Sequence, residues 1–247
     1  MDRFKNTLKR MGPLLIVLLI VFIYKMLKGG MGSFSSWFYW TLVSLPGIIV
    51  GLAFHEWAHA FVSDKLGDPL PRNQGRVTLN PFHHIDPFGF LCLIFVGFGW
   101  GVPVQIDPRY YKNRRRGEIM VALAGVITNF LIAAVLSMAV RLLIPAMGSF
   151  IMTKVGVTTL YVILSAININ LVLMVFNLIP VPPLDGFSVI TQIFRLDEKS
   201  WYYDIYRNAQ LILIILVVFN IPWYIIEPVR NVLLKLLLGS DLSSVFI

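Results

Sequence analysis

Long apolar runs separated by short polar segments dominate the chain. After a basic start, apolar residues run over 13–24, 39–62, 88–104, 118–144, 156–180 and 209–238. A hydrocarbon layer of about 30 Å is crossed by about 20 apolar residues of helix, so the longer runs predict transmembrane helices. We therefore expect an all-α polytopic membrane protein with about 5–6 spans.

The first and last runs each allow two interpretations. Residues 13–24 follow a basic segment, as in a signal peptide, but no small-x-small cleavage site follows, and Lys25 and Lys28 close the run. A retained first helix is the prediction, and a cleaved leader is the alternative. The run over 209–238 contains Pro222 and Pro228, so it is one bent span or two short ones.

The run over 88–104 cannot be a continuous helix, because glycines and a proline interrupt it repeatedly. We interpret it as a re-entrant segment. Residues 76–79, between two turn-rich stretches, predict a short strand, so a short β-hairpin is expected in the same region. Irregular backbone at membrane depth is tolerated only where protein or a water-filled cavity surrounds it. This region is therefore expected to line the active site.

Composition supports a single membrane domain over residues 1–247. Hydrophobic residues make up 57% of the chain and charged residues only 14%, against about 25% in soluble domains. The net charge of +8 comes from Lys and Arg in the short loops, so it reflects membrane topology, and no nucleic-acid partner is predicted. The single cysteine, Cys92, excludes an internal disulfide.

The strongest chemical signal is the sequence His55-Glu56-Trp-Ala-His59 near the end of the second run. Two histidines four residues apart on a helix point from one face at a spacing that one cation can bridge. In the H-E-x-x-H arrangement the histidines bind zinc and the glutamate takes a proton from the water that the metal activates. A chance match is the alternative, but ionisable residues inside an apolar span are costly unless they are paired or metal-bound.

Catalytic zinc usually has three protein ligands and an open position, so a third ligand must come from elsewhere. His83, His84 and Glu118 are candidates, and Asp185 stands out by its context. It follows the proline-broken segment 177–184 and precedes Gly186, which permits close backbone approach. Taken alone, the same segment is also an ordinary helix end with a capping Asp.

Charge predicts the orientation of this site. With the N-terminus inside and 88–104 re-entrant, most of the 21 Lys and Arg residues lie in inside loops, whereas a full crossing at 88–104 moves a strongly basic loop outside. The positive-inside rule thus favours a cytoplasmic N-terminus in a multi-pass protein of the cell membrane. It also places the histidine pair and Asp185 toward the cytoplasmic side.

H-E-x-x-H in a membrane span, followed more than a hundred residues later by the Asn177–Gly186 sequence N-L-I-P-V-P-P-L-D-G, resembles the site-2 protease family of intramembrane zinc metalloproteases. The resemblance implies one Zn²⁺ per chain, held by His55, His59 and Asp185, with Glu56 as the catalytic residue. It implies a compact member without a PDZ or CBS domain, and a catalytic core at about residues 37–190.

Two further stretches resemble the family. Residues 75–87 look like its hairpin and loop, and Gly125-Val-Ile-Thr-Asn129 looks like its G-x-x-x-N motif, although Val126 stands where proline is common. Asn129 would suit hydrogen bonding to substrate or an oxyanion, or bonding between helices, and Asn177 carries the same ambiguity. His84 is expected to orient a loop or a metal ligand rather than bind zinc.

The predicted reaction is hydrolysis of a peptide bond in or next to a transmembrane segment of substrate membrane proteins. The predicted partners are the substrate's transmembrane helix, the lipid bilayer and regulatory membrane proteins. Alternatives are a membrane zinc or ion transporter, because such residues also mark ion pathways, an inactive binding-only homologue, and another membrane-associated H-E-x-x-H peptidase. An intact Glu56 argues against the inactive homologue, and the absence of relay residues over several spans argues against the transporter.

Overall fold

The computed structural model describes residues 23, 33–96, 99–239 and 242, and this part of the chain is helical with irregular connections. Three long helices form its centre: α2 (Phe34–Lys65), α5 (Arg114–Leu143) and α6 (Lys154–Leu178). The shorter α-helices are α3 (Leu70–Asn73), α4 (Pro87–Val96), α7 (Asp185–Phe194), α8 (Tyr202–Arg207), α9 (Ala209–Val218) and α10 (Trp223–Leu238). The 3₁₀ turns are η1 (Pro81–His83), η2 (Pro108–Tyr110), η3 (Gly148–Met152) and η4 (Leu196–Glu198).

Among the described residues, α2, α5 and α6 are long and apolar enough to cross a membrane. The pair α9 and α10, bent by 73° at residues 219–222, makes a fourth if it counts as one span. The protein thus has three to four such elements in its described part, fewer than the 5–6 expected from the apolar runs. The helix expected over residues 13–24 lies outside the described residues.

Polar residues at the predicted boundaries start the three long helices. The side chains of Ser33, Asn113 and Thr153 accept hydrogen bonds from backbone amides three residues later, at 3.0–3.2 Å. Each bond satisfies one amide that the first helical turn leaves without a partner. The apolar runs therefore begin as helices where polar caps precede them.

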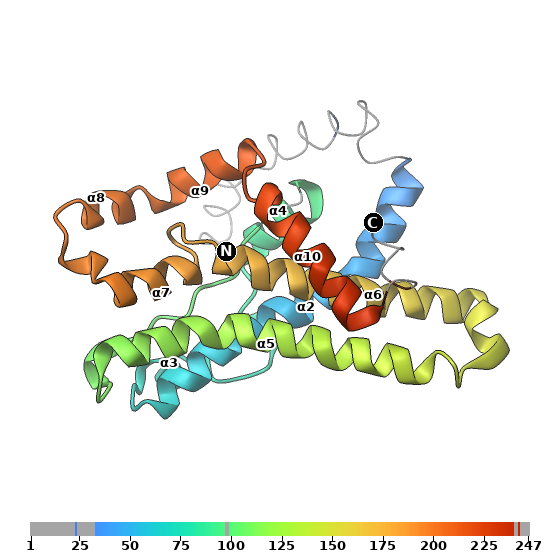
Figure 1. Ribbon diagram of the computed structural model, residues 1–247, viewed down its shortest axis with the longest axis horizontal. Helices are drawn as coiled ribbons and strands as arrows, with labels where there is room; N and C mark the ends of the chain where they lie inside the picture. Colours follow the sequence, from blue (N-terminus) through green and yellow to red (C-terminus); the bar gives the residue numbers. More distant parts are fainter. Residues whose placement is uncertain (1–22, 24–32, 97–98, 240–241, 243–247) are drawn as a thin grey trace, which may run out of the picture.

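Small residues allow α2 and α6 to pack closely. A Cβ added to Gly47 would lie 2.6 Å from the Cα atom of Ala166, and one added to Gly51 would lie 2.7 Å from a methyl group of Leu173. Gly47 and Gly51 are four residues apart, the small-xxx-small spacing that brings membrane helices together. These contacts run in the same chain direction, so α2 and α6 are parallel, while α5 runs antiparallel to both (Figure 1).

The segment between α3 and α5 doubles back. Ile85 and Gly101 form an isolated antiparallel bridge, and the Val102 amide donates to the His84 carbonyl at 2.7 Å. From residue 85 the chain therefore passes through the short α4 and returns at residue 101 to the position from which it started, as a half-span segment must.

The strand expected at residues 76–79 is not formed; these residues are irregular. The reason is the buried Arg76, whose guanidinium donates to the carbonyls of His83 and Val102 and so holds the segment around itself. In addition, the Thr78 carbonyl lies 2.7 Å from Nε2 of His84, so it bonds a side chain instead of a strand. Alternating apolar residues did not reveal these side-chain partners.

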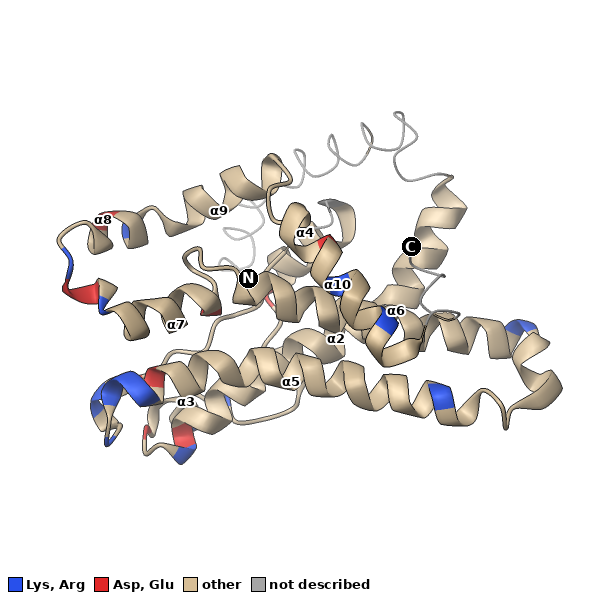
Figure 2. Ribbon diagram, in the orientation of Figure 1, with Lys and Arg blue, Asp and Glu red and all other residues tan. Residues whose placement is uncertain are grey.

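Charged side chains gather at one end of the molecule, where α3, the start of α5 and the α7–α8 connection lie (Figure 2). At this end Arg115 ties α7 to α5, because its guanidinium lies 3.3 Å from Gln192 Oε1, and Glu118 accepts from Gln192 Nε2 at 2.7 Å. The position of α7 relative to α5 is thereby fixed by partly buried polar contacts as well as by apolar packing.

Candidate metal centre

Three side chains from two distant parts of the sequence converge inside the helix bundle. His55 and His59 on α2 are buried, and their Nε2 atoms lie 3.0 Å apart. Oδ2 of Asp185, the first residue of α7, lies 3.2 Å from His55 Nε2 and 3.4 Å from His59 Nε2. Two ligands of a tetrahedral zinc ion, each about 2.0–2.1 Å from it, are about 3.3 Å apart. The three separations therefore fit one small cation.

The other nitrogen of each imidazole has a hydrogen-bond acceptor beside it. Nδ1 of His55 lies 2.6 Å from Oδ1 of Asn129, and Nδ1 of His59 lies 2.7 Å from the carbonyl oxygen of Val121. Each Nδ1 therefore donates a proton, and in the neutral imidazole this leaves the lone pair on Nε2. Asp185 Oδ2 is buried and has no hydrogen-bond partner among the described residues. Two neutral imidazoles in this tautomer and a carboxylate form a site suited to a cation.

The proline-rich turn between α6 and α7 places Asp185. Residues 179–184 end one helix, and Ile179 and Leu184 are buried in a cluster with Val126 of α5. Gly186 is required here because an added Cβ would lie 2.2 Å from the Leu178 carbonyl oxygen. The carboxylate stands in the first turn of α7, where the helix dipole favours negative charge.

Glu56 lies beside the three converging residues but is not one of them. Its Oε2 accepts a hydrogen bond from the Val104 amide at 3.2 Å, so the returning segment after α4 holds the carboxylate. Gly101 of that segment also approaches it, because an added Cβ would lie 3.8 Å from Glu56 Oε1. A carboxylate next to a cation site but outside the ligand set is suited to proton transfer.

The remaining residues predicted from the sequence have different surroundings. Asn129 is fully buried and bonds His55 directly. Asn177 donates to the Leu173 carbonyl of its own helix at 2.9 Å. His84 is fully buried and bonds Thr78, and its Nδ1 has no hydrogen-bond partner among the described residues. Asn129 thus contacts one of the three converging side chains, whereas no hydrogen bond among the described residues joins Asn177 or His84 to His55, His59 or Asp185.

Asn170, which the sequence pattern did not single out, is fully buried in α6 and accepts a hydrogen bond from Asn129 at 2.9 Å. The sequence did contain a sign of this residue's importance, because a side-chain amide in the middle of an apolar run requires a hydrogen-bond partner. The backbone partners Val121 and Val104 carried no signal, since any residue supplies a carbonyl or an amide.

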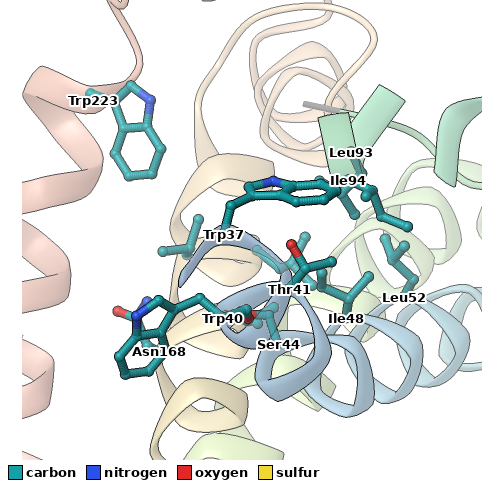
Figure 3. Close-up of a pocket in the computed structure, with 13 residues that line it drawn as sticks. Trp37, Trp40, Thr41, Ser44, Ile48, Leu52, Leu93, Ile94, Asn168 and Trp223 are labelled. Atoms are coloured by element: carbon teal, nitrogen blue, oxygen red, sulfur yellow. The ribbon is translucent and has the colours of Figure 1, made fainter. Parts of the chain in front are cut away.

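A cavity of about 430 Å³ lies between α2, α4, α6 and the start of α10, and its lining on α2 ends at Leu52, three residues before His55. Figure 3 shows Trp37 and Trp40 of α2 on its wall, with Trp223 on another element. On α2 its lining includes Thr41, Ser44, Ile48 and Leu52, a stripe at three- and four-residue spacing. Continued along α2, the same spacing reaches His55 and Glu56.

The chain is similar to known proteins over most of its length. The family model described as peptidase family M50 matches residues 43–219. YwhC of Bacillus subtilis, named provisionally as a zinc metalloprotease, is 34% identical over 186 residues, which are 74% of this chain and 84% of YwhC. No solved structure matches the chain at a significant level.

Two further relatives, both also named provisionally as zinc metalloproteases, are more distant. Rip2 of Mycobacterium tuberculosis (strain H37Rv) is 27% identical over 70% of this chain and 65% of its own length. MJ0611 of Methanocaldococcus jannaschii is 27% identical over 60% of this chain and 69% of its own length. The family match covers most of the chain and both segments that supply the converging side chains. The protein belongs to peptidase family M50, the site-2 protease family of intramembrane zinc metalloproteases.

Proposed function

We propose that His55, His59 and Asp185 hold one zinc ion, and that Glu56 is the acid/base in hydrolysis of a peptide bond in or next to a substrate's transmembrane segment. One observation carries this assignment: two imidazole Nε2 atoms and a carboxylate oxygen converge within 3.0–3.4 Å of one another in a buried site. When bound there, zinc supplies Lewis-acid activation of water and of the scissile carbonyl.

The chain's own residues handle the proton. Glu56 takes a proton from the attacking water and returns it to the leaving amine, and the Val104 amide keeps its carboxylate in place between these steps. Asn129 and the Val121 carbonyl hold the imidazoles of His55 and His59 at fixed orientations. The site therefore needs no rearrangement of its ligands during the reaction.

Substrate approaches through the apolar cavity beside α2. Its occupant is a transmembrane helix of the substrate, because the lining is apolar and aromatic and the α2 stripe continues to Glu56. Residues 102–107, which are irregular and follow the Ile85–Gly101 bridge, then offer the backbone groups not already bonded within the protein to the unwound segment around the scissile bond. In this arrangement the re-entrant segment completes the substrate site.

The charged end of the molecule faces the cytoplasm. Lys65, Arg72 and the arginines at the start of α5 lie at this end, together with the metal-site half of α2 (Figure 2). The positive-inside rule therefore places the metal centre toward the cytoplasmic side of the cell membrane, in a multi-pass protein with residues 1–247 as one domain and regulatory membrane proteins as further partners.

The test combines zinc content with cleavage of a test transmembrane substrate by detergent-purified wild type, Glu56→Gln and Asp185→Asn. We expect stoichiometric zinc in wild type and Glu56→Gln, loss of zinc in Asp185→Asn, and cleavage by wild type alone. Normal zinc content and cleavage in Asp185→Asn would overturn the ligand assignment. Uptake of zinc into sealed vesicles without cleavage would instead favour a transporter.

A further inference from the structure

Asn170 is a polar side chain at the centre of the bundle that the proposed reaction does not use. It lies in the apolar helix α6 and is fully buried. Its Nδ2 donates to the Ala166 carbonyl at 2.8 Å, and its Oδ1 accepts from Nδ2 of Asn129 at 2.9 Å. A buried amide with both ends bonded is held in a single orientation.

The orientation of Asn170 determines that of Asn129. Because Asn170 presents an oxygen, Asn129 must present its amide nitrogen, and the second hydrogen of that nitrogen goes to the Gly51 carbonyl at 3.1 Å. Oδ1 of Asn129 is therefore directed at Nδ1 of His55, 2.6 Å away. The proton of His55 stays on Nδ1, and Nε2 keeps its lone pair toward His59 and Asp185.

A reversed Asn129 amide would have the opposite effect on the metal centre. Its oxygen would then face two other oxygens, those of Gly51 and Asn170, and its nitrogen would donate to His55 Nδ1. His55 would have to carry its proton on Nε2, the atom directed at the metal position. Asn170 supplies one of the two acceptors that disfavour this state.

We infer that Asn170 is a positioning residue, which acts through Asn129 to hold His55 in the tautomer that binds the metal. The inference rests on the proposed metal centre. A hydrogen bond that only joins α5 to α6 would differ from this role in one respect. Amides that only join helices stabilise the bundle independently of one another, whereas a residue that acts through Asn129 has no further effect on zinc affinity once Asn129 is removed.

The experiment measures the zinc dissociation constant by chelator competition in detergent for Asn170→Leu, Asn129→Ala and the double variant. Loss of a residue that supports a metal ligand typically weakens binding about 10–100-fold. We expect Asn129→Ala in this range, Asn170→Leu at about 10-fold, and the double variant equal to Asn129→Ala. Asn170→Ala removes the same amide without added bulk, in case the leucine impairs folding.

Asn168→Leu is the matched control, because Asn168 is two residues away on the same helix and its Oδ1 has no hydrogen-bond partner among the described residues. The Asn168→Leu variant should have the zinc affinity of wild type. Asn170→Asp, protonated in this apolar site, keeps both an acceptor and a donor. It should therefore bind zinc with the affinity of wild type. In the metal-free protein, ¹⁵N spectra of labelled histidine should show an Nδ1-protonated His55 that becomes a tautomer mixture in Asn170→Leu.

Wild-type zinc affinity in both Asn170→Leu and Asn170→Ala would overturn the inference. It would also be overturned if the loss of zinc affinity in the double variant equalled the sum of the losses in the two single variants. Failure of the wild type itself to bind zinc would instead reject the proposed metal centre. The two failures are therefore distinguishable in one set of measurements.

Discussion

Gly125 of α5 lies directly against the imidazole of His55: a Cβ added to Gly125 would fall 2.6 Å from Nδ1 of His55 and 2.6 Å from Nε2 of His59. No real Cβ atom comes this close, so α5 can pack on the metal side of α2 only because this position has no side chain. The glycine of the G-x-x-x-N motif thus makes room for the histidines, and Asn129 one turn later bonds one of them.

Gly125→Ala should therefore weaken zinc binding by about 10-fold or more, because the added methyl group displaces both imidazoles from their hydrogen-bonded positions. Chelator competition measures the loss. Gly156→Ala is a suitable control, since its Cβ would clash with the Phe150 carbonyl at 2.2 Å, away from the metal centre. The control should lower thermal stability and leave zinc affinity unchanged; equal affinities in both variants would contradict the prediction.

Removal of the metal should destabilise the wild-type fold. A ligand present at 100 times its dissociation constant stabilises the folded state by about 2.7 kcal/mol, so a strong chelator should lower the melting temperature of wild type. Asp185→Asn, which lacks one ligand, should melt at a lower temperature without chelator and respond little to its addition. A chelator response of equal size in both proteins would show that the stabilising metal is bound elsewhere.

His84 should make stability depend on pH on the acid side. Burial is the main reason that the pKa of His84 lies below 6.5, and the charge of Arg76 lowers it further. As the pH falls below about 6.5, His84 takes up a proton in the unfolded chain but stays neutral in the folded protein. The free energy of unfolding therefore decreases by at most about 1.4 kcal/mol per pH unit. Above pH 6.5 this contribution is constant.

The measurement is thermal melting from pH 7.5 to 5 for wild type and His84→Gln. His84→Gln should have a shallower acid slope than wild type, because the glutamine takes up no proton in either state. An unchanged slope in His84→Gln would mean that His84 is protonated equally in the folded and unfolded states.

Filling the cavity beside α2 should reduce cleavage of the substrate more than it reduces the zinc content. Thr41→Trp places a large side chain on the cavity wall, far from the ligands, and should reduce cleavage of a transmembrane substrate at least several-fold while zinc content stays stoichiometric. Thr158→Trp, on a separate surface of α6, is the control and should cleave normally. Full activity of Thr41→Trp would exclude this cavity as the substrate path.

Much of the arrangement followed from local patterns. Apolar length predicted α2, α5 and α6, and the spacing of His55 and His59 predicted that they share a helix face. Asp185 stood out by its proline-broken context, but that context alone also fits an ordinary helix end, and the resemblance to the family implied its role as a ligand. The helices and the shared face of His55 and His59 are confirmed, because each of these predictions rests on a few neighbouring residues whose physical effect does not depend on the rest of the chain.

Other features depend on contacts between distant segments. The irregular path of residues 76–79 follows from the buried Arg76, which bonds carbonyls up to 26 residues away. The roles of Gly125 and Asn170 follow from the closeness of α2, α5 and α6, and helix periodicity does not give that closeness. Backbone partners such as Val121 leave no trace in side-chain identity.

The support for His55 comes from two neutral amides, Asn129 and Asn170, where many metal sites use a carboxylate. The two amides add no charge of their own to the centre. In a bundle surrounded by lipid, a carboxylate in their place would add a negative charge in a medium of low dielectric constant, and the amide pair supplies the same orientation with none.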